Sequence, residues 1–142
     1  MTPKSQIYDL FIQFFATAPI QKITGMTLSY DEKGQAVFTM PRNPNFDHAL
    51  NDTHGGLIAT LLDNAGWFTA AAHYEKWVVT TDLNIHLLES AQQSDLIATG
   101  HLVRTGKNLA VASMEVRIKD GQLIAIGSGS FMVTSKSIEG KV

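Results

Sequence analysis

The chain has 142 residues, of which 11 are basic and 13 acidic, and its isoelectric point lies near 6.2. This length fits one domain whose core is stable without cross-links. The chain contains no cysteine, which excludes disulfides, thiolate nucleophiles and cysteine metal sites, and the balanced charge without a basic stripe argues against a nucleic-acid partner.

The first eighteen residues predict a short amphipathic helix. Thr2 is the expected N-cap, Pro3 takes the first helical position, and apolar side chains then recur at helical spacing until Ala18 and Pro19 end the pattern. The segment lacks the features of a secretory signal, and no run of about 18 apolar residues occurs in the chain. We therefore expect a cytoplasmic protein without a membrane span.

Six strands and one long helix are predicted after this segment. Two strands at residues 26–30 and 35–40 form a hairpin around the turn-forming residues 31–34. A loop rich in Asn, Pro and Asp then leads into an apolar helix from near His54 to about Tyr74. Four more runs with strand character follow at residues 77–88, 95–104, 109–119 and 122–134.

This order of elements predicts an α+β fold. An antiparallel sheet of about six strands has one face to bury, and only the central helix is long and apolar enough to cover it. We expect the sheet to wrap around that helix in one domain spanning residues 1–142. The N-terminal helix takes residues 1–18, and residues 135–142 form a polar tail.

The central helix carries a single carboxylate, Asp63, among small residues. A buried carboxylate costs several kcal/mol unless it is paired, hydrogen-bonded or neutralised. Two interpretations are open: Asp63 is a satisfied acid in an ordinary packed interface, or a ligand or partner helix approaches it closely. The positions three, four and seven residues away hold Gly56, Ala59, Thr60, Gly66, Trp67 and Ala70.

Three segments of the chain read HGGLIATLLDNA from His54, TTDLNIHLLESA from Thr80 and RTGKNLAVASMEVRIKDGQLIAIGSGSFMV from Arg104. Together they resemble the hotdog-fold acyl-CoA thioesterases, and within these the phenylacetic-acid-degradation type. The resemblance covers roughly residues 46–133, and the hotdog fold matches the order of elements above. It implies hydrolysis of acyl-CoA, with coenzyme A as part of the substrate and no other cofactor. It also implies a homodimer or homotetramer with sites at the dimer interface.

The resemblance assigns catalytic roles to the central helix and the strand after it. Asp63 is the general base or nucleophile, and a backbone N–H at the start of the helix binds the thioester oxygen. We choose Gly55 as that donor, because a helix N-terminus offers unpaired N–H groups and the positive end of the dipole. His54 either orients this loop or the substrate carbonyl, or is simply a helix-entry residue bonded to backbone. Thr80 matches a Ser or Thr that helps hold the attacking water, and is otherwise an ordinary strand residue.

Further candidate residues bind the substrate. The family usually has Asn six residues before His54 and Gly three before it, where this chain has His48 and Asn51. Asn tolerates positive φ, so Asn51 can stand in for the glycine, and we keep both residues as candidates. Trp67 is expected to help shape an acyl pocket, together with Phe46, Phe68, Trp77 and Leu88.

The loop at residues 104–108 corresponds to a region that commonly holds the phosphates of coenzyme A in the resembling proteins. Arg104 and Lys107 supply charge there, and Asn108 adds a hydrogen bond. A solvated hairpin loop is the alternative interpretation. No metal site is predicted, because His73, His86 and His101 lie on different elements without ligand spacing.

Two rival functions have specific sequence requirements. A non-catalytic hotdog module that binds acyl-CoA or another acyl ligand has no need of Asp63 beside the thioester. A hydratase or dehydratase needs an Asp and a His together, whereas His54 lies nine residues before Asp63 at the far end of the helix. Gly55 and Asp63 are eight residues apart, about 12 Å along one helix. We therefore expect each site to combine these residues from two subunits.

Overall fold

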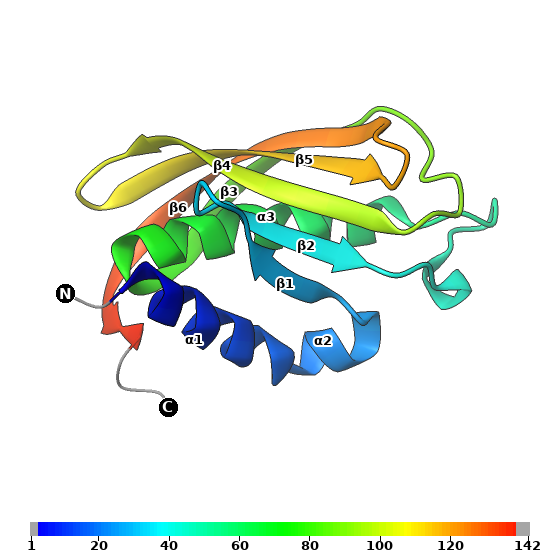
Figure 1. Cartoon of the computed structure of the whole chain (residues 1–142). Helices are drawn as coiled ribbons and strands as arrows, with labels where there is room; N and C mark the ends of the chain where they lie inside the picture. Colours follow the sequence, from blue (N-terminus) through cyan, green and yellow to red (C-terminus); the bar gives the residue numbers. More distant parts are fainter. Residues whose placement is uncertain (1–2, 139–142) are drawn as a thin grey trace.

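Helix α3, Gly55–Tyr74, runs through the middle of the molecule, and a six-stranded sheet curves around it (Figure 1). The computed structural model describes residues 3–138. The helix is rich in Ala and Leu, which favour helix, and it ends where Glu75 adopts a left-handed conformation with φ 55°. The predicted long helix is confirmed.

The sheet has the strand order β1-β2-β4-β5-β6-β3, and all neighbouring strands are antiparallel. The six predicted strands and the α+β hotdog fold are confirmed. One boundary differs: the last strand continues to Ser137, so residues 135–137 are not part of a polar tail, and residues 139–142 lie outside the described range. The strands are β1 Thr27–Tyr30, β2 Ala36–Met40, β3 Lys76–Leu87, β4 Leu96–Thr105, β5 Leu109–Ile118 and β6 Leu123–Ser137.

The core lies between α3 and the concave face of the sheet. Strand β2 alternates strictly, with Ala36, Phe38 and Met40 buried. In β4, Gly100 lies so close to the carbonyl oxygen of Ala65 that no Cβ would fit, which lets the helix approach the sheet closely. Each large apolar side chain buried here stabilises the fold by about 1.5–3 kcal/mol.

The N-terminal segment forms two helices, α1 at Lys4–Ala16 and α2 at Pro19–Thr24, where one was predicted. Pro19 ends the first pattern as expected, but it also takes the first turn of α2, which Gly25 closes with φ 70°. The predicted cap is wrong in register, because Pro3 is the N-cap rather than the first helical residue, and Thr2 lies outside the described range.

Helix α1 lies alongside β1 and α3 (Figure 1). Phe11 and Phe15 are buried at this contact and meet Phe68 edge-on, with ring centroids 5.9 and 5.6 Å away. Edge-to-face contacts of this kind favour aromatic pairs beyond the area that they bury. They hold α1 against the part of α3 beyond Asp63.

Strand β3 forms one edge of the sheet, since it pairs only with β6. It is twelve residues long, and Val79, Leu83 and Leu87 are 48%, 37% and 54% exposed. A long edge strand with exposed apolar side chains is a template for pairing with another strand. None of the helices within residues 3–138 is both long and apolar enough to cross a membrane.

Candidate active site

Asp63 lies in the middle of α3 on the side that faces β3. The hydroxyl of Thr80 donates a hydrogen bond of 2.8 Å to its Oδ1. One helical turn later the indole of Trp67 donates to the carbonyl oxygen of Val78, at 2.9 Å. These two bonds fix the register between α3 and β3, and they bring three predicted site residues together.

Strand β3 is irregular where it meets Asp63. Its pairing with β6 shifts by one residue between Thr80 and Asp82. Such bulges re-aim side chains and are frequent beside active sites. Thr80 is half-buried and turns toward α3, whereas the neighbouring Thr81 is exposed and donates to the carbonyl oxygen of Ser130.

The environment of Asp63 disfavours its charged form. Burial raises the pKa of this carboxyl above its ordinary value, and the hydrogen bond from Thr80 opposes the rise. The sequence alone did not predict whether this pKa is raised or lowered, and in the structure the burial of the carboxyl raises it. A carboxylate with a raised pKa is a stronger base than an exposed aspartate.

The N-terminus of α3 carries a free donor. His54 is the N-cap, and its Nδ1 accepts the N–H of Gly56 at 2.8 Å, while its carbonyl oxygen accepts the N–H of Leu57 at 2.9 Å. His54 is thus bonded to backbone at the start of the helix, and within residues 3–138 the N–H of Gly55 has no acceptor.

The side chain of Leu87 occupies the space where a side chain at position 55 would begin. A Cβ on Gly55 would come within 2.5 Å of the Cδ1 atom of Leu87. Leu87 is at the end of β3 and more than half exposed, so its side chain has room to move. A residue with a Cβ at position 55 therefore requires Leu87 to move.

The loop before α3 contains His48 and Asn51, the two residues that differ from the family pattern. Asn51 has φ 62°, which confirms that this residue adopts the left-handed conformation expected of a glycine substitute. His48 is exposed, and its Nδ1 accepts the N–H of Leu50 at 3.1 Å. His48 thus stabilises its own turn, near the N-terminal end of α3.

A polar network that the sequence analysis missed fixes this loop. Arg42 forms a bidentate ion pair with Asp47, with a 2.7 Å bond from Nη2 to Oδ2. Asp52 accepts the backbone N–H groups of Gln92 and Gln93, both at 3.1 Å. Burial opposes ionisation of Asp52, but the hydrogen bonds from backbone prevail and lower its pKa. These contacts tie the start of α3 to the β3–β4 loop.

The proposed acyl-pocket residues separate into two groups. Trp67, Phe68 and Trp77 pack in one aromatic cluster, with ring centroids 4.7 Å apart for the first pair and 5.5 Å for Trp67 and Trp77. Phe46 belongs to the short 3-10 helix η1, Pro44–Phe46, and Leu88 is exposed after β3. Of the five, Trp67 is the one that lies one turn from Asp63.

Arg104, Lys107 and Asn108 lie at the β4–β5 hairpin and are exposed. The hydroxyl of Tyr74 donates a 2.6 Å hydrogen bond to the carbonyl oxygen of Gly106, which holds the hairpin at the C-terminal end of α3. Tyr74 is eleven residues beyond Asp63, about 16 Å along the helix. The three loop residues are therefore remote from Asp63.

The predicted site residues thus fall at three places along α3: the N-terminus, the middle and the C-terminal end. Gly55 and Asp63 are separated by about 12 Å along the axis, so one chain does not bring both to one small group. In the part of the chain that the structure describes, no group of three or more His, Asp or Glu side chains is placed to hold a metal ion.

Comparison with known proteins places this site in context. Residues 50–125 match the model of the thioesterase superfamily. Human acyl-coenzyme A thioesterase 13 is 33% identical over 106 residues, covering 72% of this chain and 75% of the relative.

Solved structures share the fold. A Bacillus halodurans protein solved with CoA is 31% identical, with a TM-score of 0.78 over 93% of this chain and 91% of that one. The PaaI protein from the phenylacetic acid degradation operon of E. coli is 18% identical, with a TM-score of 0.85 over 96% of this chain and 99% of that one. At that identity the PaaI likeness concerns the fold alone.

Proposed function

The chain belongs to the thioesterase superfamily, and we propose that it hydrolyses acyl-CoA thioesters to a free acid and CoA. The observation that carries this proposal is the Asp63 carboxylate, half-buried on α3 and hydrogen-bonded to Thr80. The human relative is named an acyl-coenzyme A thioesterase, and the Bacillus halodurans relative was solved with CoA. A binding module without catalysis has no use for this carboxylate.

Asp63 acts as general base on a water molecule that Thr80 helps to hold, or as the nucleophile itself. In the first case the water oxygen bonds to the thioester carbon while its proton passes to Asp63. The carbonyl oxygen gains negative charge and is stabilised by a backbone N–H. The C–S bond then breaks, and the CoA sulfur leaves with a proton.

The N–H donor in this mechanism is Gly55 of the partner subunit. Two α3 helices running antiparallel across a two-fold axis bring the N-terminus of one beside the middle of the other. The edge strand β3 supports this arrangement, because it lies next to Asp63 and exposes Val79 and Leu83 for pairing. A homodimer is the smallest assembly that completes the site, and a tetramer of two such dimers is compatible with it.

The remaining candidates are assigned to the substrate. Arg104, Lys107 and Asn108 hold the CoA phosphates, and Trp67 bounds the acyl group one turn from Asp63. His48 and Asn51 shape the loop at the N-terminus of α3 rather than contribute charge. This division puts the charged contacts far from the reacting carbon.

A hydrolysis screen over a panel of acyl-CoA esters, with thiol release as the readout, tests the function. Turnover of at least one ester by the parent chain, absent when Asp63 is replaced, is the expected result. Binding of acyl-CoA esters without thiol release from any of them would instead establish the non-catalytic module.

The double variant Arg104→Gln/Lys107→Gln is expected to raise KM for the CoA ester about tenfold, equivalent to roughly 1.4 kcal/mol, with little change in kcat. Contacts remote from the reacting carbon bind the ground state and transition state alike. The measurement is steady-state kinetics with a CoA ester and with a short thioester that lacks the nucleotide. Lys119→Gln, in the β5–β6 turn, is the charge control. An equal loss with both substrates would contradict the assignment.

Thr80→Val is expected to lower kcat about tenfold, the effect of one lost hydrogen bond. Because the Thr80 hydroxyl lowers the pKa of Asp63, its removal raises that pKa further. A base acts only when ionised, so the acid limb of the kcat/KM profile moves to higher pH. Thr81→Val, whose hydroxyl bonds Ser130 instead, should leave the limb in place. An unmoved limb in Thr80→Val would rule out this pairing in catalysis.

A further inference from the structure

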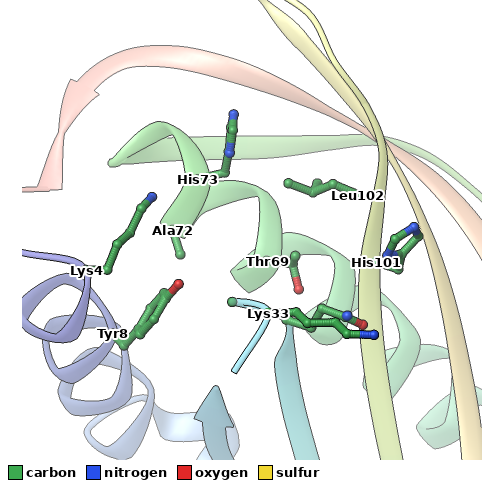
Figure 2. A pocket seen from close by; sticks show the side chains of 10 residues that line it. Lys4, Tyr8, Lys33, Thr69, Ala72, His73, His101 and Leu102 are labelled. Carbon is green, nitrogen blue, oxygen red and sulfur yellow. The ribbon is translucent and has the colours of Figure 1, made fainter. Parts of the chain in front are cut away.

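A cavity of about 360 Å³ lies beside the last turns of α3 (Figure 2). It is on a different face of this helix from Asp63. Asp63 contacts β3, whereas Thr69 of this cavity accepts the N–H of Ala36 in β2 at 2.9 Å. The cavity lies between the first turns of α1, the β1–β2 turn, the last turns of α3 and β4. The titratable and hydroxyl side chains that line it are Lys4, Tyr8, Lys33, Thr69, His73 and His101.

Four ionisable nitrogen groups line this cavity from four separate elements, namely Lys4, Lys33, His73 and His101, and all four residues are exposed. Among the described residues, no carboxylate lines the cavity. Within residues 3–138 the ion pairs are Arg42–Asp47 and Arg117–Glu115, so neither lysine has an anionic partner. Like charges gathered without a counter-charge repel one another, and a bound anion relieves that repulsion.

The carboxylates of the adjoining hollows are Asp31, Glu32 and Glu115. Asp31, in the same turn as Lys33, accepts the backbone N–H groups of Lys33 and Gln35, both at 2.9 Å. Asp31 and Glu32 line an adjacent hollow that shares Lys33 and Gln35 with this cavity. Glu115 lies in a hollow that shares His101 with this cavity, but it is paired with Arg117 at 3.1 Å.

The hydroxyl of Tyr8 and the apolar side chains of Ala72 and Leu102 complete the lining. The hydroxyl of Tyr8 stands over Gly34, where an added Cβ would lie 2.5 Å from it, and it has no hydrogen-bond partner among the described residues. The ring is held by stacking on Tyr30, with centroids 4.3 Å apart. Ala72 and Leu102 contribute apolar surface. The volume equals about twelve waters at roughly 30 Å³ each, which leaves room beyond a bare oxyanion for an organic group.

We propose that this cavity binds the phosphate of a small organic phosphomonoester, at a site separate from Asp63. Lys4 and Lys33 supply two positive charges, which match the charge of about −1.5 to −2 on a phosphomonoester at neutral pH. Tyr8, His73 and His101 supply hydrogen-bond donors to its oxygens. The organic part of the ligand rests against Ala72 and Leu102.

The pKa of His73 gives an independent measure of phosphate binding in this cavity. Burial and the positive charge of Lys4 lower the pKa of His73. The other ionisable groups that line the cavity with His73 are Lys4 and Tyr8 from α1, Lys33 from the β1–β2 turn and His101 from β4, and the His73 ring contacts that of Tyr74. A phosphate among these groups opposes the effect of Lys4, so binding raises the pKa of His73.

Calorimetric titration with adenosine 5′-monophosphate at fixed ionic strength tests the proposal, with adenosine as the uncharged control. We expect the monophosphate to bind and adenosine not to bind. Lys4→Gln/Lys33→Gln should weaken binding at least about tenfold, since two charge-assisted contacts are lost. Lys119→Gln should leave it unchanged, because this residue lies outside the cavity. Thermal unfolding checks that each variant is folded.

Two further measurements complete the test. Titration of the histidine ring protons by NMR should show the pKa of His73 rising when the monophosphate is added. Comparison of CoA with dephospho-CoA reveals whether the 3′-phosphate of CoA is one source of the phosphomonoester. The proposal is overturned if the monophosphate does not bind at about 10 mM. It is also overturned if adenosine binds equally well, or if binding survives Lys4→Gln/Lys33→Gln.

Discussion

Asp63→Asn is expected to lower kcat by a factor of about 10² to 10⁴ while the protein remains folded. The amide is nearly isosteric with the carboxylate and still accepts the hydrogen bond from Thr80, so the contact between α3 and β3 persists. It neither accepts a proton from water nor attacks the thioester carbon. The measurement is thiol release under saturating acyl-CoA.

The same variant should be as stable as the parent at neutral pH, or more stable. Burial raises the pKa of Asp63 in the folded state above its value in the unfolded chain. The parent protein therefore loses stability as the pH rises from the pKa of Asp63 in the unfolded chain through its higher pKa in the folded protein. The amide of the variant is uncharged, so its contribution to stability does not change with pH. Thermal unfolding should show a higher or equal Tm for the variant at pH 7. The advantage should disappear below the ordinary pKa of aspartate.

Asp9→Asn is the matched control for this substitution. Asp9 is exposed on α1, away from Asp63 and from Thr80, so its variant should keep parental turnover and Tm. Turnover within a few-fold of the parent in Asp63→Asn would remove Asp63 from the chemistry. A fall in Tm at neutral pH would mean that the charge of Asp63 stabilises the fold instead.

The sequence predicted most of the fold because its signals are local. The turn-forming residues between β1 and β2 and the apolar character of α3 are local features, and both predicted the elements that the structure has. The error at α2 has a local cause as well. Proline ends one helical pattern and begins another equally well, and the six residues from Pro19 are too few to show helical periodicity.

Candidate site residues could be predicted from the sequence where a single residue differs clearly from its neighbours. Asp63 stands out because a charge interrupts a small, apolar helix, and Asn51 because few residues accept positive φ. The network of Arg42, Asp47 and Asp52 gave no such signal, since turn-rich segments contain Asp for local reasons and the partner Gln92 lies forty residues away. The cavity lined by Lys4, Lys33, His73 and His101 gave no signal in the sequence either, because its residues come from four elements that only the fold brings together.

A mixture of two inactive variants, Gly55→Pro and Asp63→Ala, is expected to recover activity through heterodimers. The first deletes the N–H donor and the second deletes the base, so each homodimer should be inactive. A heterodimer has one site that combines Gly55 of the Asp63→Ala subunit with Asp63 of the Gly55→Pro subunit. Complete subunit exchange of an equal mixture should give about a quarter of parental activity, since half of the dimers are mixed and one of their two sites is intact.

The backbone at this position accepts proline. Gly55 is the first residue of α3, where proline is well tolerated, and His54 before it has ψ 136°, the extended conformation that a residue preceding proline prefers. Any side chain at position 55 displaces Leu87, so Gly55→Ala serves as the control: it introduces the same Cβ but keeps the N–H. Gly55→Ala should retain far more activity than Gly55→Pro, which separates loss of the donor from crowding.

Within a single chain, Gly55 and Asp63 are about 12 Å apart along α3. If each site lay inside one chain, every chain in the mixture would lack either the donor or the base, and subunit exchange would restore no activity. Recovery of activity therefore distinguishes a shared site from an internal one. Heterodimer formation is verified by mass spectrometry of a mixture in which one variant is isotopically labelled. If mixed dimers form and the mixture stays inactive, the thioester oxygen is not held by Gly55 across the subunit interface, and the assignment of the donor fails.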